Sequence, residues 1–339
     1  MKGVVVSVLL LGLILAGCNR KPEQPQNYLY KQIVADHPVL DHVVQDIDTG
    51  SIYRVGLKGN LIDQLNPDAG KLRGFDLKDS ILAWVSDSSS ISLLNINTNK
   101  QRIIALDSSL KIHHDLVLHY PYLTALYKAK PNKIFKTYTI TNESFVTIDL
   151  RDNQMKTWSI LDFVDDTWLP DSSTYVNAHS NSVEVDEAGN YYVSFRDISQ
   201  VWKISPDLST VIYRVGVNSP FKLAGKDFIG QHSVDIVRPD EFFLYDNGST
   251  GKQVVKSRIV RVVVDPQQKT YNVKVILDLP DTLRTIRMGS VQALGDRLSV
   301  SVFNRGFHIL ELDTTGHVHN HLFYEKAHSI KVLPELAKE

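Results

Sequence analysis

The sequence predicts an all-β protein, a six-bladed β-propeller with a central channel, and two observations carry this prediction. Helical periodicity is hard to find after residue 30, and short runs rich in Val, Ile, Tyr and Phe alternate instead with turn residues. These runs fall into roughly six groups of about three or four strands each, with a period of about 35 to 55 residues that is typical of propeller blades. The groups begin near His42, Leu77, His114, Ser182, Ser233 and Ser290. The competing all-β prediction is a pair of β-sandwiches.

The turns between the predicted strands have residues that are typical of hairpin loops. Leu57-Lys58-Gly59-Asn60 and Asp313-Thr314-Thr315-Gly316 contain glycine, and Asp265-Pro266-Gln267-Gln268 contains proline. Residues 142–170 are less regular, and residues 158–164 within them favour a short helix. In a propeller the innermost strand of every blade faces one central channel. Residues at the start of successive inner strands therefore converge there, however far apart they are in sequence.

Composition and charge are those of an ordinary globular protein. The 339-residue chain is 43% hydrophobic and 22% charged, and its formal net charge is -1. This length and apolar content allow a sizeable core. Nucleic-acid-binding domains usually carry a basic excess, so this charge balance argues against a nucleic-acid partner.

The N-terminal residues are expected to be a targeting segment and not part of the folded domain. Lys2 gives a positive start, residues 4–15 form a short apolar run, and small residues then precede Cys18. This pattern resembles the lipobox of bacterial lipoproteins, in which the cysteine is lipidated; the alternative is an ordinary secretory signal. Asn19 after the cysteine favours the outer membrane, with the protein facing the periplasm.

The expected organisation has three parts. Residues 1–17 form the lipoprotein signal peptide, residues 18–30 the lipidated cysteine and a polar tether, and residues 31–339 one propeller domain. The membrane partner is then reached through the lipid on Cys18. Because Cys18 is the single cysteine, no internal disulfide and no thiolate metal site is expected.

Three of the twelve histidines stand just before or at the first strand of their groups. They are His114, His179 and His232, and in a propeller they would surround one channel mouth. Each also has an ordinary structural interpretation as a packed or solvated side chain. His113 and His114 are adjacent, for example, so in a strand they face opposite ways.

Arginines near these histidines favour an oxyanion site over a metal site. Arg196 follows one predicted strand and Arg258 starts another. The planar guanidinium gives paired, charge-assisted hydrogen bonds to sulfate or phosphate and suits a divalent cation badly. A three-histidine zinc site that recruits Asp115 stays open as an alternative.

Two other patterns have weaker chemical interpretations. His317, His319 and His321 alternate like a row of metal ligands, but they follow a glycine turn and favour an outer, solvated strand. The chain has no P-loop, no Rossmann glycine pattern and no G-x-S-x-G motif. A mechanism that depends on a nucleotide therefore has no visible binding loop.

The ordered motifs resemble the bacterial aryl-sulfate sulfotransferases, which use no nucleotide sulfate donor. The likeness extends over about residues 53–322. Its motifs are Ile112-His113-His114-Asp115, Ala178-His179-Ser180-Asn181-Ser182, Ser194-Phe195-Arg196, Gln231-His232, Leu244-Tyr245-Asp246-Asn247-Gly248 and Ser257-Arg258. Each motif is short, but the ordered set with similar spacing is fairly specific.

The resemblance implies a six-bladed propeller with its site in the channel and no cofactor or metal. The family histidine that accepts the sulfuryl group follows a glutamine and matches His232, while two assisting histidines match His114 and His179. The family arginine that binds sulfate matches Arg196. Arg258 matches the Ser-Arg step, and with Asn181 it completes the expected substrate-binding residues. The family often has tryptophan where this chain has Asn177, and the interval from His179 to Arg196 is one residue short.

The expected activity is transfer of a sulfuryl group from a phenolic sulfate donor to a phenol acceptor through a sulfohistidine. His232 attacks sulfur, and Arg196 with one assisting histidine holds the sulfuryl oxygens. The other assisting histidine, either His114 or His179, moves the proton. One rival is a non-catalytic surface propeller that binds a glycan, peptide or protein partner, and another is a metal-dependent lyase or hydrolase. The sequence leaves the physiological substrates and the oligomeric state open.

Overall fold

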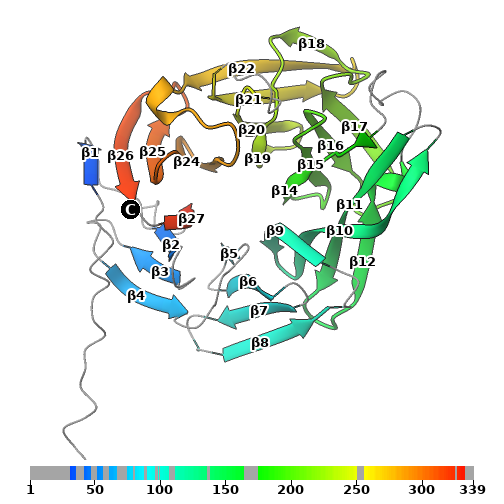
Figure 1. The fold of residues 1–339 in the computed structure, drawn as a ribbon, viewed down its shortest axis with the longest axis horizontal. Coiled ribbons are helices and arrows are strands. Elements are labelled where there is room, and N and C mark those ends of the chain that lie inside the picture. Colours follow the sequence, from blue (N-terminus) through cyan, green and yellow to red (C-terminus); the bar gives the residue numbers. More distant parts are fainter. Residues whose placement is uncertain are drawn as a thin grey trace, which may run out of the picture.

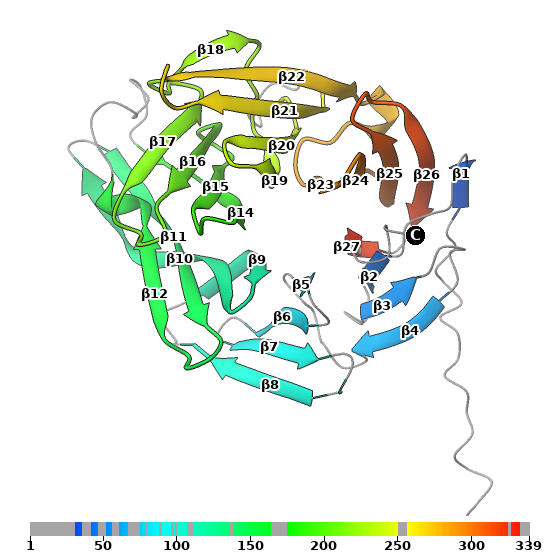
Figure 2. The ribbon, with the colours of Figure 1, turned by 180° about the vertical axis from the view of Figure 1, so that it is seen from behind.

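The fold is given by a computed structural model of the chain. The residues that it describes are 31–35, 42–46, 52–55, 61–66, 75–78, 81–87, 90–95, 98, 100–106, 111–135, 138–163, 175–249, 256–324 and 327–332. Strands dominate these residues, and they form six hydrogen-bonded sheets. The sheets follow one another around a ring (Figures 1 and 2).

Each sheet is built from strands that are consecutive or nearly consecutive in the chain. The first three sheets are β27-β2-β3-β4 (Ala327–Val332, His42–Asp46, Ile52–Val55, Leu61–Asn66), β5-β6-β7-β8 (Phe75–Lys78, Ile81–Asp87, Ser90–Asn95, Lys100–Ala105) and β9-β10-β11-β12 (Lys111–His119, Tyr122–Phe135, Tyr138–Asp149, Met155–Ser159), with β13 (Tyr175–Val176) beside β11.

The next three sheets carry the second half of the chain. They are β14-β15-β16-β17 (Ser180–Val185, Tyr191–Phe195, Gln200–Ile204, Val211–Gly216), β19-β20-β21-β22-β18 (His232–Arg238, Glu241–Asp246, Arg258–Asp265, Thr270–Asp278, Lys222–Gly225) and β23-β24-β25-β26-β1 (Ser290–Leu294, Arg297–Phe303, Phe307–Asp313, Val318–Tyr324, Lys31–Ala35). Neighbouring strands are antiparallel except for β18 with β22 and β13 with β11.

The last strand joins the first sheet. The C-terminal strand β27 pairs with β2, with Val332 opposite His42, so the last described strand joins the sheet of β2–β4. The N-terminal strand β1 pairs instead with β26 of the preceding sheet. These two pairings link sheets at opposite ends of the sequence and close the ring (Figure 1).

Apolar side chains pack between successive sheets. Four buried clusters join five consecutive sheets, from the sheet that contains β5–β8 to the sheet that contains β23–β26. Trp202 is fully buried between two of these sheets, with the rings of Trp158 and Phe195 around it. Burial of one such large apolar side chain contributes about 1.5–3 kcal/mol. These faces explain why most strands carry apolar residues on both sides.

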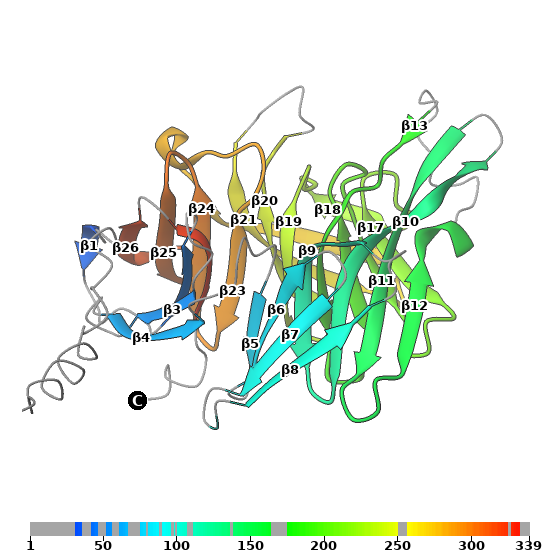
Figure 3. The same ribbon diagram turned by 60° about the horizontal axis from the view of Figure 1, so that its bottom comes forward.

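The structure confirms the all-β class and the propeller arrangement that the sequence predicts. The rival pair of β-sandwiches is wrong, because the sheets form a ring and not two facing pairs (Figure 3). Side-chain packing links five sheets, whereas the sheet with β27 and β2–β4 is described by its backbone alone. A count of six blades around an open channel therefore stays a prediction.

The predicted helix over residues 158–164 is wrong in extent. Trp158 belongs to strand β12, where it lies opposite Phe145. A single 3₁₀ turn, Ile160–Asp162, follows, and the Ser159 side chain caps it by accepting from the Leu161 N–H. Pairing with β11 thus overrides the local helical pattern. Within the described part of the chain, no helix has the length and apolar character to span a membrane.

Candidate active site

The segment before β19 fixes the position of His232. Gly230 has φ +64°, and a Cβ there would lie 1.8 Å from the main-chain oxygen of Ser249, so only glycine fits. Gln231 is fully buried, and its amide donates to the main-chain oxygens of Phe195 and Gln200 at 3.2 and 3.0 Å. The glutamine therefore anchors the start of β19 to the turn between β15 and β16. This is the physical role of the Gln-His pair.

His232 and His179 occupy similar places in their blades, but they are offset by one residue. His232 is the first residue of β19 and pairs with Tyr245, whereas Ser180 pairs with Phe195 in the preceding blade. His179 precedes Ser180, in a left-handed conformation with φ +56°. A bulge follows at the start of each strand, after Ser180 in β14 and after His232 in β19.

Asn247 holds the imidazole of His232. Nδ1 of His232 lies 2.7 Å from Oδ1 of Asn247. The amide nitrogen of Asn247 donates to the main-chain oxygens of Thr285 and Met288 at 3.1 and 2.9 Å, so its Oδ1 must accept. Nδ1 of His232 therefore carries the proton, and the lone pair is on Nε2.

The second nitrogen of His232 also has a partner. The main-chain N–H of Met288 donates to Nε2 at 3.2 Å, which fits a neutral ring with its lone pair at that atom. Burial lowers the pKa of His232 to about 4. The bond with Asn247 opposes this shift, and the charges of Arg196 and His179 add to it. At neutral pH the ring is uncharged, with a defined nucleophilic nitrogen.

Arg196, Asp197 and His179 form a connected cluster next to this ring. Nη1 of Arg196 donates to Oδ1 of Asp197 at 2.5 Å, and Nδ1 of His179 lies 3.4 Å from Oδ2 of the same carboxylate. The main-chain N–H of Arg196 donates to the main-chain oxygen of His179, which places the two residues side by side. Although burial raises the pKa of Asp197, His179 and Arg196 outweigh it and hold that pKa below its usual value. Asp197 is thus a carboxylate that orients both predicted site residues.

A short segment, here called the strap (residues 285–289), lies across both groups. Nη2 of Arg196 donates to the main-chain oxygen of Ile286 at 2.9 Å, while Met288 contacts His232 as described above. Arg196 and His232 are therefore held by backbone atoms only two residues apart, and the buried Nε–H of Arg196 has no partner among the described residues.

Arg258 is buried against the carboxylate of Asp246. Its guanidinium is buried and donates from Nε to Oδ2 of Asp246 at 2.7 Å and from Nη2 to the main-chain oxygen of Asp227 at 2.7 Å. Burial raises the pKa of Asp246, and Arg258 with the main-chain N–H groups of Ile229 and Gly248 opposes that shift. These contacts support the turn that carries Asn247. They give Arg258 a structural role, and its contact with substrate stays a prediction.

Asn181 lies at the bulge of β14, beside the start of β19. Its amide nitrogen donates to the main-chain oxygen of Gln231 at 2.7 Å. Its Oδ1 is buried and has no hydrogen-bond partner in the described part of the chain. Asn181 therefore faces the segment before His232 and keeps an acceptor for a further donor.

Two further predicted site residues, His114 and Cys18, lie partly or wholly outside the residues that the structure describes. His114 belongs to β9, an inner strand that contacts β14, but its side chain and that of Asp115 are outside the described residues. Cys18 and the whole leader region also lie outside them. Asn177, where the family often has tryptophan, donates to Oδ2 of Asp197 at 3.1 Å. It thus belongs to the Arg196–His179 cluster.

The alternating histidines near the C-terminus do not converge on one point. His321 contacts His308, with 3.0 Å between Nε2 and Nδ1, whereas His319 lies 3.6 Å from Asp313. Among the described residues no group of three or more His, Cys, Asp or Glu side chains could hold a metal ion. Phe195 and Tyr245, which stand in two of the motifs, are fully buried in the core.

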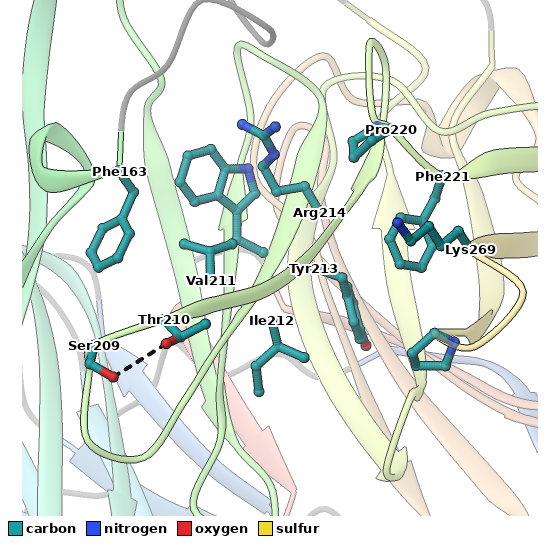
Figure 4. A pocket seen from close by; sticks show the side chains of 12 residues that line it. Phe163, Ser209, Thr210, Val211, Ile212, Tyr213, Arg214, Pro220, Phe221 and Lys269 are labelled. Atoms are coloured by element: carbon teal, nitrogen blue, oxygen red, sulfur yellow. Dashed lines mark hydrogen bonds between the residues drawn. The ribbon is translucent and has the colours of Figure 1, made fainter.

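A cavity of about 470 Å³ lies elsewhere, along the outer strand β17 (Figure 4). Val211, Tyr213 and Arg214 line it from β17, with Phe163 and Phe221 beside them. His232, His179 and Arg196 are not among its lining residues. Its position on the outer rim separates it from the imidazole and guanidinium groups that could do chemistry.

Three contributors were missed at the level of sequence. Asn247 stands in the motif Leu244-Tyr245-Asp246-Asn247-Gly248 but carries no predicted role, and no motif includes Asp197. Met288 acts through its main chain, so its side chain gave no signal. The proximity of Asn247 and Asp197 to motif residues was the one available hint.

Comparison with known proteins gives one family and a fold likeness. A family model described as Arylsulfotransferase (ASST) matches residues 109–323. No curated protein matches the chain significantly. A protein of unknown function from Bacteroides caccae is 9% identical, with a TM-score of 0.54 over 86% of this chain and 98% of that chain.

Two further solved structures are more distant. The Malassezia sympodialis allergen Mala s 1 has a TM-score of 0.48 and 13% identity over 77% of this chain and 78% of that chain. Virginiamycin B lyase from Staphylococcus aureus has a TM-score of 0.45 and 9% identity over 87% and 88%. The Bacteroides likeness supports the fold alone.

Proposed function

The chain belongs to the arylsulfotransferase family, and from that premise we propose that it moves a sulfuryl group from a phenolic sulfate to a phenol through a sulfohistidine at His232. The observation that carries this proposal is the fixed tautomer of His232. Its Nδ1–H is bound to Asn247, so the lone pair stands on Nε2. A neutral, oriented imidazole is the form in which histidine acts as a nucleophile.

In the first half of the proposed reaction, Nε2 of His232 attacks sulfur in line with the phenolic oxygen. The N–S bond forms as the S–O bond to the aryl ring breaks, and the electron pair leaves with the phenolate. The ring then carries positive charge, which the hydrogen bond from Nδ1–H to Asn247 stabilises. Desolvation, which disfavours a charged ring, makes this support more important.

Arg196 is the proposed clamp for the sulfuryl oxygens. Its side chain is 14% exposed, its Nε–H is free among the described residues, and its Nη2 rests on a main-chain oxygen that a stronger anionic acceptor can replace. Charge on the sulfuryl oxygens shifts during transfer, and a fixed guanidinium stabilises it at no cost of reorganisation. His114 is proposed to assist from the neighbouring inner strand β9.

His179 is the proposed proton donor and acceptor. It is 40% exposed, so phenols can reach it, and Asp197 orients it through Nδ1. In the first half it protonates the departing phenolate, whose conjugate acid has a pKa of about 10. In the second half it takes the proton of the incoming phenol, whose oxygen attacks sulfur as the N–S bond breaks. Asn181 is the proposed contact of that phenol hydroxyl, through an Oδ1 that is buried and has no partner among the described residues.

Several wider features belong to the same proposal. We propose that the six sheets act as six blades, that substrates enter through a central channel, and that the aryl sulfate alone is the donor, without nucleotide, metal or other cofactor. The order of steps gives ping-pong kinetics. We also propose that Cys18 carries the lipid that holds the protein at the outer membrane, facing the periplasm. Replacement of Cys18 by Ser should release the protein from the membrane fraction.

The central experiment uses 4-nitrophenyl sulfate as donor and phenol as acceptor. Release of nitrophenolate should follow ping-pong kinetics, and His232→Ala should abolish it. His317→Ala, at an exposed turn, is the matched control and should keep full activity. Intact mass should show one added sulfuryl group on the wild type with donor alone. Full activity of His232→Ala would overturn the assignment, and no turnover by the wild type would favour a non-catalytic binding protein.

A further inference from the structure

The main chain of the strap (residues 285–289) is hydrogen-bonded to both His232 and Arg196, the two side chains that the proposed reaction needs. Nε2 of His232, the atom that would attack sulfur, accepts the main-chain N–H of Met288 at 3.2 Å. Nη2 of Arg196, the proposed clamp, donates to the main-chain oxygen of Ile286 at 2.9 Å. A sulfur atom must approach Nε2 along the direction of its lone pair, where the Met288 N–H now stands. The structure therefore shows His232 closed to attack.

Both ends of the strap are fixed, and between them Arg287 and the Met288 oxygen are bonded to Thr285 and Asn247. At one end, the Thr285 N–H and main-chain oxygen both bond the Ser257 hydroxyl, at 3.2 and 3.0 Å. At the other end, Gly289 packs so closely on Tyr245 that an added Cβ would lie 2.7 Å from its ring. Between them, Ile286 is 48% exposed. A change confined to Ile286 and Met288 would thus free the site without moving the ends.

Met288 has an unusual backbone conformation for a non-glycine residue, with φ +63°. Such positions persist where surrounding contacts hold them, and they cluster at switch regions and ligand clamps. Here the holding contacts are the bond to His232 and the bond from Asn247 to the Met288 oxygen. Loss of the first contact would remove one of the two restraints on this conformation.

We propose that the strap is a latch that an oxyanion opens, and that it selects sulfate esters over neutral aryl esters. The proposal rests on the proposed function. A bound sulfate offers acceptors to both donors that now serve the strap. Arg196 passes from the Ile286 oxygen to one sulfuryl oxygen, and the Met288 N–H passes from Nε2 to another. The exposed Ile286 oxygen turns to water, and Nε2 is left free to attack.

A neutral ester opens this latch poorly, because it has no charged oxygens to draw Arg196 from Ile286. In this exchange the Met288 N–H and Nη2 of Arg196 each gain a sulfuryl oxygen in place of their present acceptor. If the strap opened without a bound oxyanion, both donors would lose a partner. The same atoms thus block the nucleophile in the free protein and contact the sulfuryl group when it arrives. The strap then determines specificity through its main chain, which explains why no side chain marks it.

A sulfonate separates opening from chemistry, because its C–S bond does not break in this reaction. In a crystal structure with 4-nitrobenzenesulfonate we expect a sulfonate oxygen within hydrogen-bond distance of the Met288 nitrogen and of Arg196. Nε2 of His232 should have lost its bond to Met288. Sulfonate bound with that bond intact would overturn the latch alone. Sulfonate that fails to bind beside His232 would count against the proposed function as well.

A second measurement tests selectivity in solution with the neutral ester 4-nitrophenyl acetate. Gly289→Ala should dislodge the strap, because the Tyr245 ring is fully buried and cannot give way. Acetylation of His232, followed by peptide mass, should then be about fivefold faster than in the wild type, the factor for loss of one hydrogen bond. Gly295→Ala is the control, since Gly295 also has positive φ, +68°, but no atom within 4 Å of an added Cβ.

The outcomes of this measurement are distinct. Equal acetylation in Gly289→Ala, Gly295→Ala and wild type would refute the latch, even if sulfuryl transfer proceeds normally. Faster acetylation of other histidines in Gly289→Ala, with no faster acetylation of His232, would also refute the latch. Should Gly289→Ala fail to fold by circular dichroism, the wild-type sulfonate structure still decides.

Discussion

Nδ1 of His232 lies 2.7 Å from Oδ1 of Asn247, an oxygen that can only accept because the Asn247 amide nitrogen is bound to two carbonyls. This single relationship decides which imidazole nitrogen is nucleophilic. It joins the first residue of one inner hairpin to the residue just beyond it, since His232 starts β19 and Asn247 follows β20. The tautomer is therefore a property of the folded hairpin.

Loss of this contact should reduce activity more than stability. Asn247→Leu removes the acceptor for Nδ1–H, so the proton can move to Nε2 and the lone pair is lost from the attacking atom. We expect kcat/KM for 4-nitrophenyl sulfate to fall by about 10²–10⁴-fold, the range for loss of correct proton placement. The free energy of unfolding should fall by about 1–3 kcal/mol, because two carbonyls lose their donor.

The control for this prediction is Asn272→Leu, on the exposed face of β22, which should change neither quantity. Unchanged turnover by Asn247→Leu in a folded protein would mean that Asn247 does not set the tautomer. The ¹⁵N chemical shifts of the His232 ring would report the proton position directly.

Activity should survive to unusually low pH. Burial holds the pKa of His232 at about 4, below the ordinary 6.5, so Nε2 keeps its lone pair well into the acid range. For the nitrophenolate burst, kcat/KM should fall on the acid side only as pH approaches about 4. An acid limb near 6.5 would show that another group, or a solvent-exposed His232, controls the step.

The same shift should make folding sensitive to acid. The unfolded chain binds a proton at His232 below about pH 6.5 and the folded chain only below about pH 4, so stability falls as pH drops through this window and is constant above it. The contribution is at most about 3 kcal/mol. Chemical denaturation of wild type and His232→Gln between pH 4 and 7 should give a smaller pH dependence for the variant. Parallel curves would contradict the shift.

Asp197 should matter most when the leaving group is poor. Asp197→Asn removes the charge that orients His179, so protonation of the departing phenolate becomes less efficient. With phenyl sulfate, whose phenol has a pKa of about 10, we expect a loss of about 10²-fold. With the better leaving group of 4-nitrophenyl sulfate the loss should be slight. Asp296→Asn, in the exposed turn between β23 and β24, is the control; equal losses with both donors would argue against a role in proton transfer.

Substitution of Arg258 should mainly lower stability, whereas substitution of Arg196 should mainly lower activity. Arg258→Ala leaves the buried carboxylate of Asp246 without its partner and should cost about 3–5 kcal/mol of stability. Arg196→Lys should leave thermal unfolding almost unchanged but lower kcat/KM, because lysine cannot make the paired contacts of a planar fork. Thermal melts with kinetics on the folded fraction would separate these effects. A stable but inactive Arg258→Ala would restore Arg258 as a substrate contact.

Two motifs and one arginine illustrate how far the sequence could go at the site. Gln231-His232 and Ser194-Phe195-Arg196 could be proposed for the site because side chains that bind or react must be of particular types in a particular order. Arg258 shows the limit of that reasoning, since the same residue type also serves as a buried partner for Asp246. The sequence cannot distinguish these roles, because they depend on whether the guanidinium faces solvent or a carboxylate.

By itself, the sequence determined the strand-and-turn pattern, the all-β class and the order of the site motifs, because each follows from residue type and local spacing. Only the tertiary structure decided the tautomer of His232, the link from Asp197 to His179 and Arg196, and the contact of the strap with Nε2. These depend on main-chain atoms and on residues such as Met288 and His232, which lie 56 positions apart. A bulge that shifts a strand by one residue changes where every side chain points, and no local pattern fixes that choice.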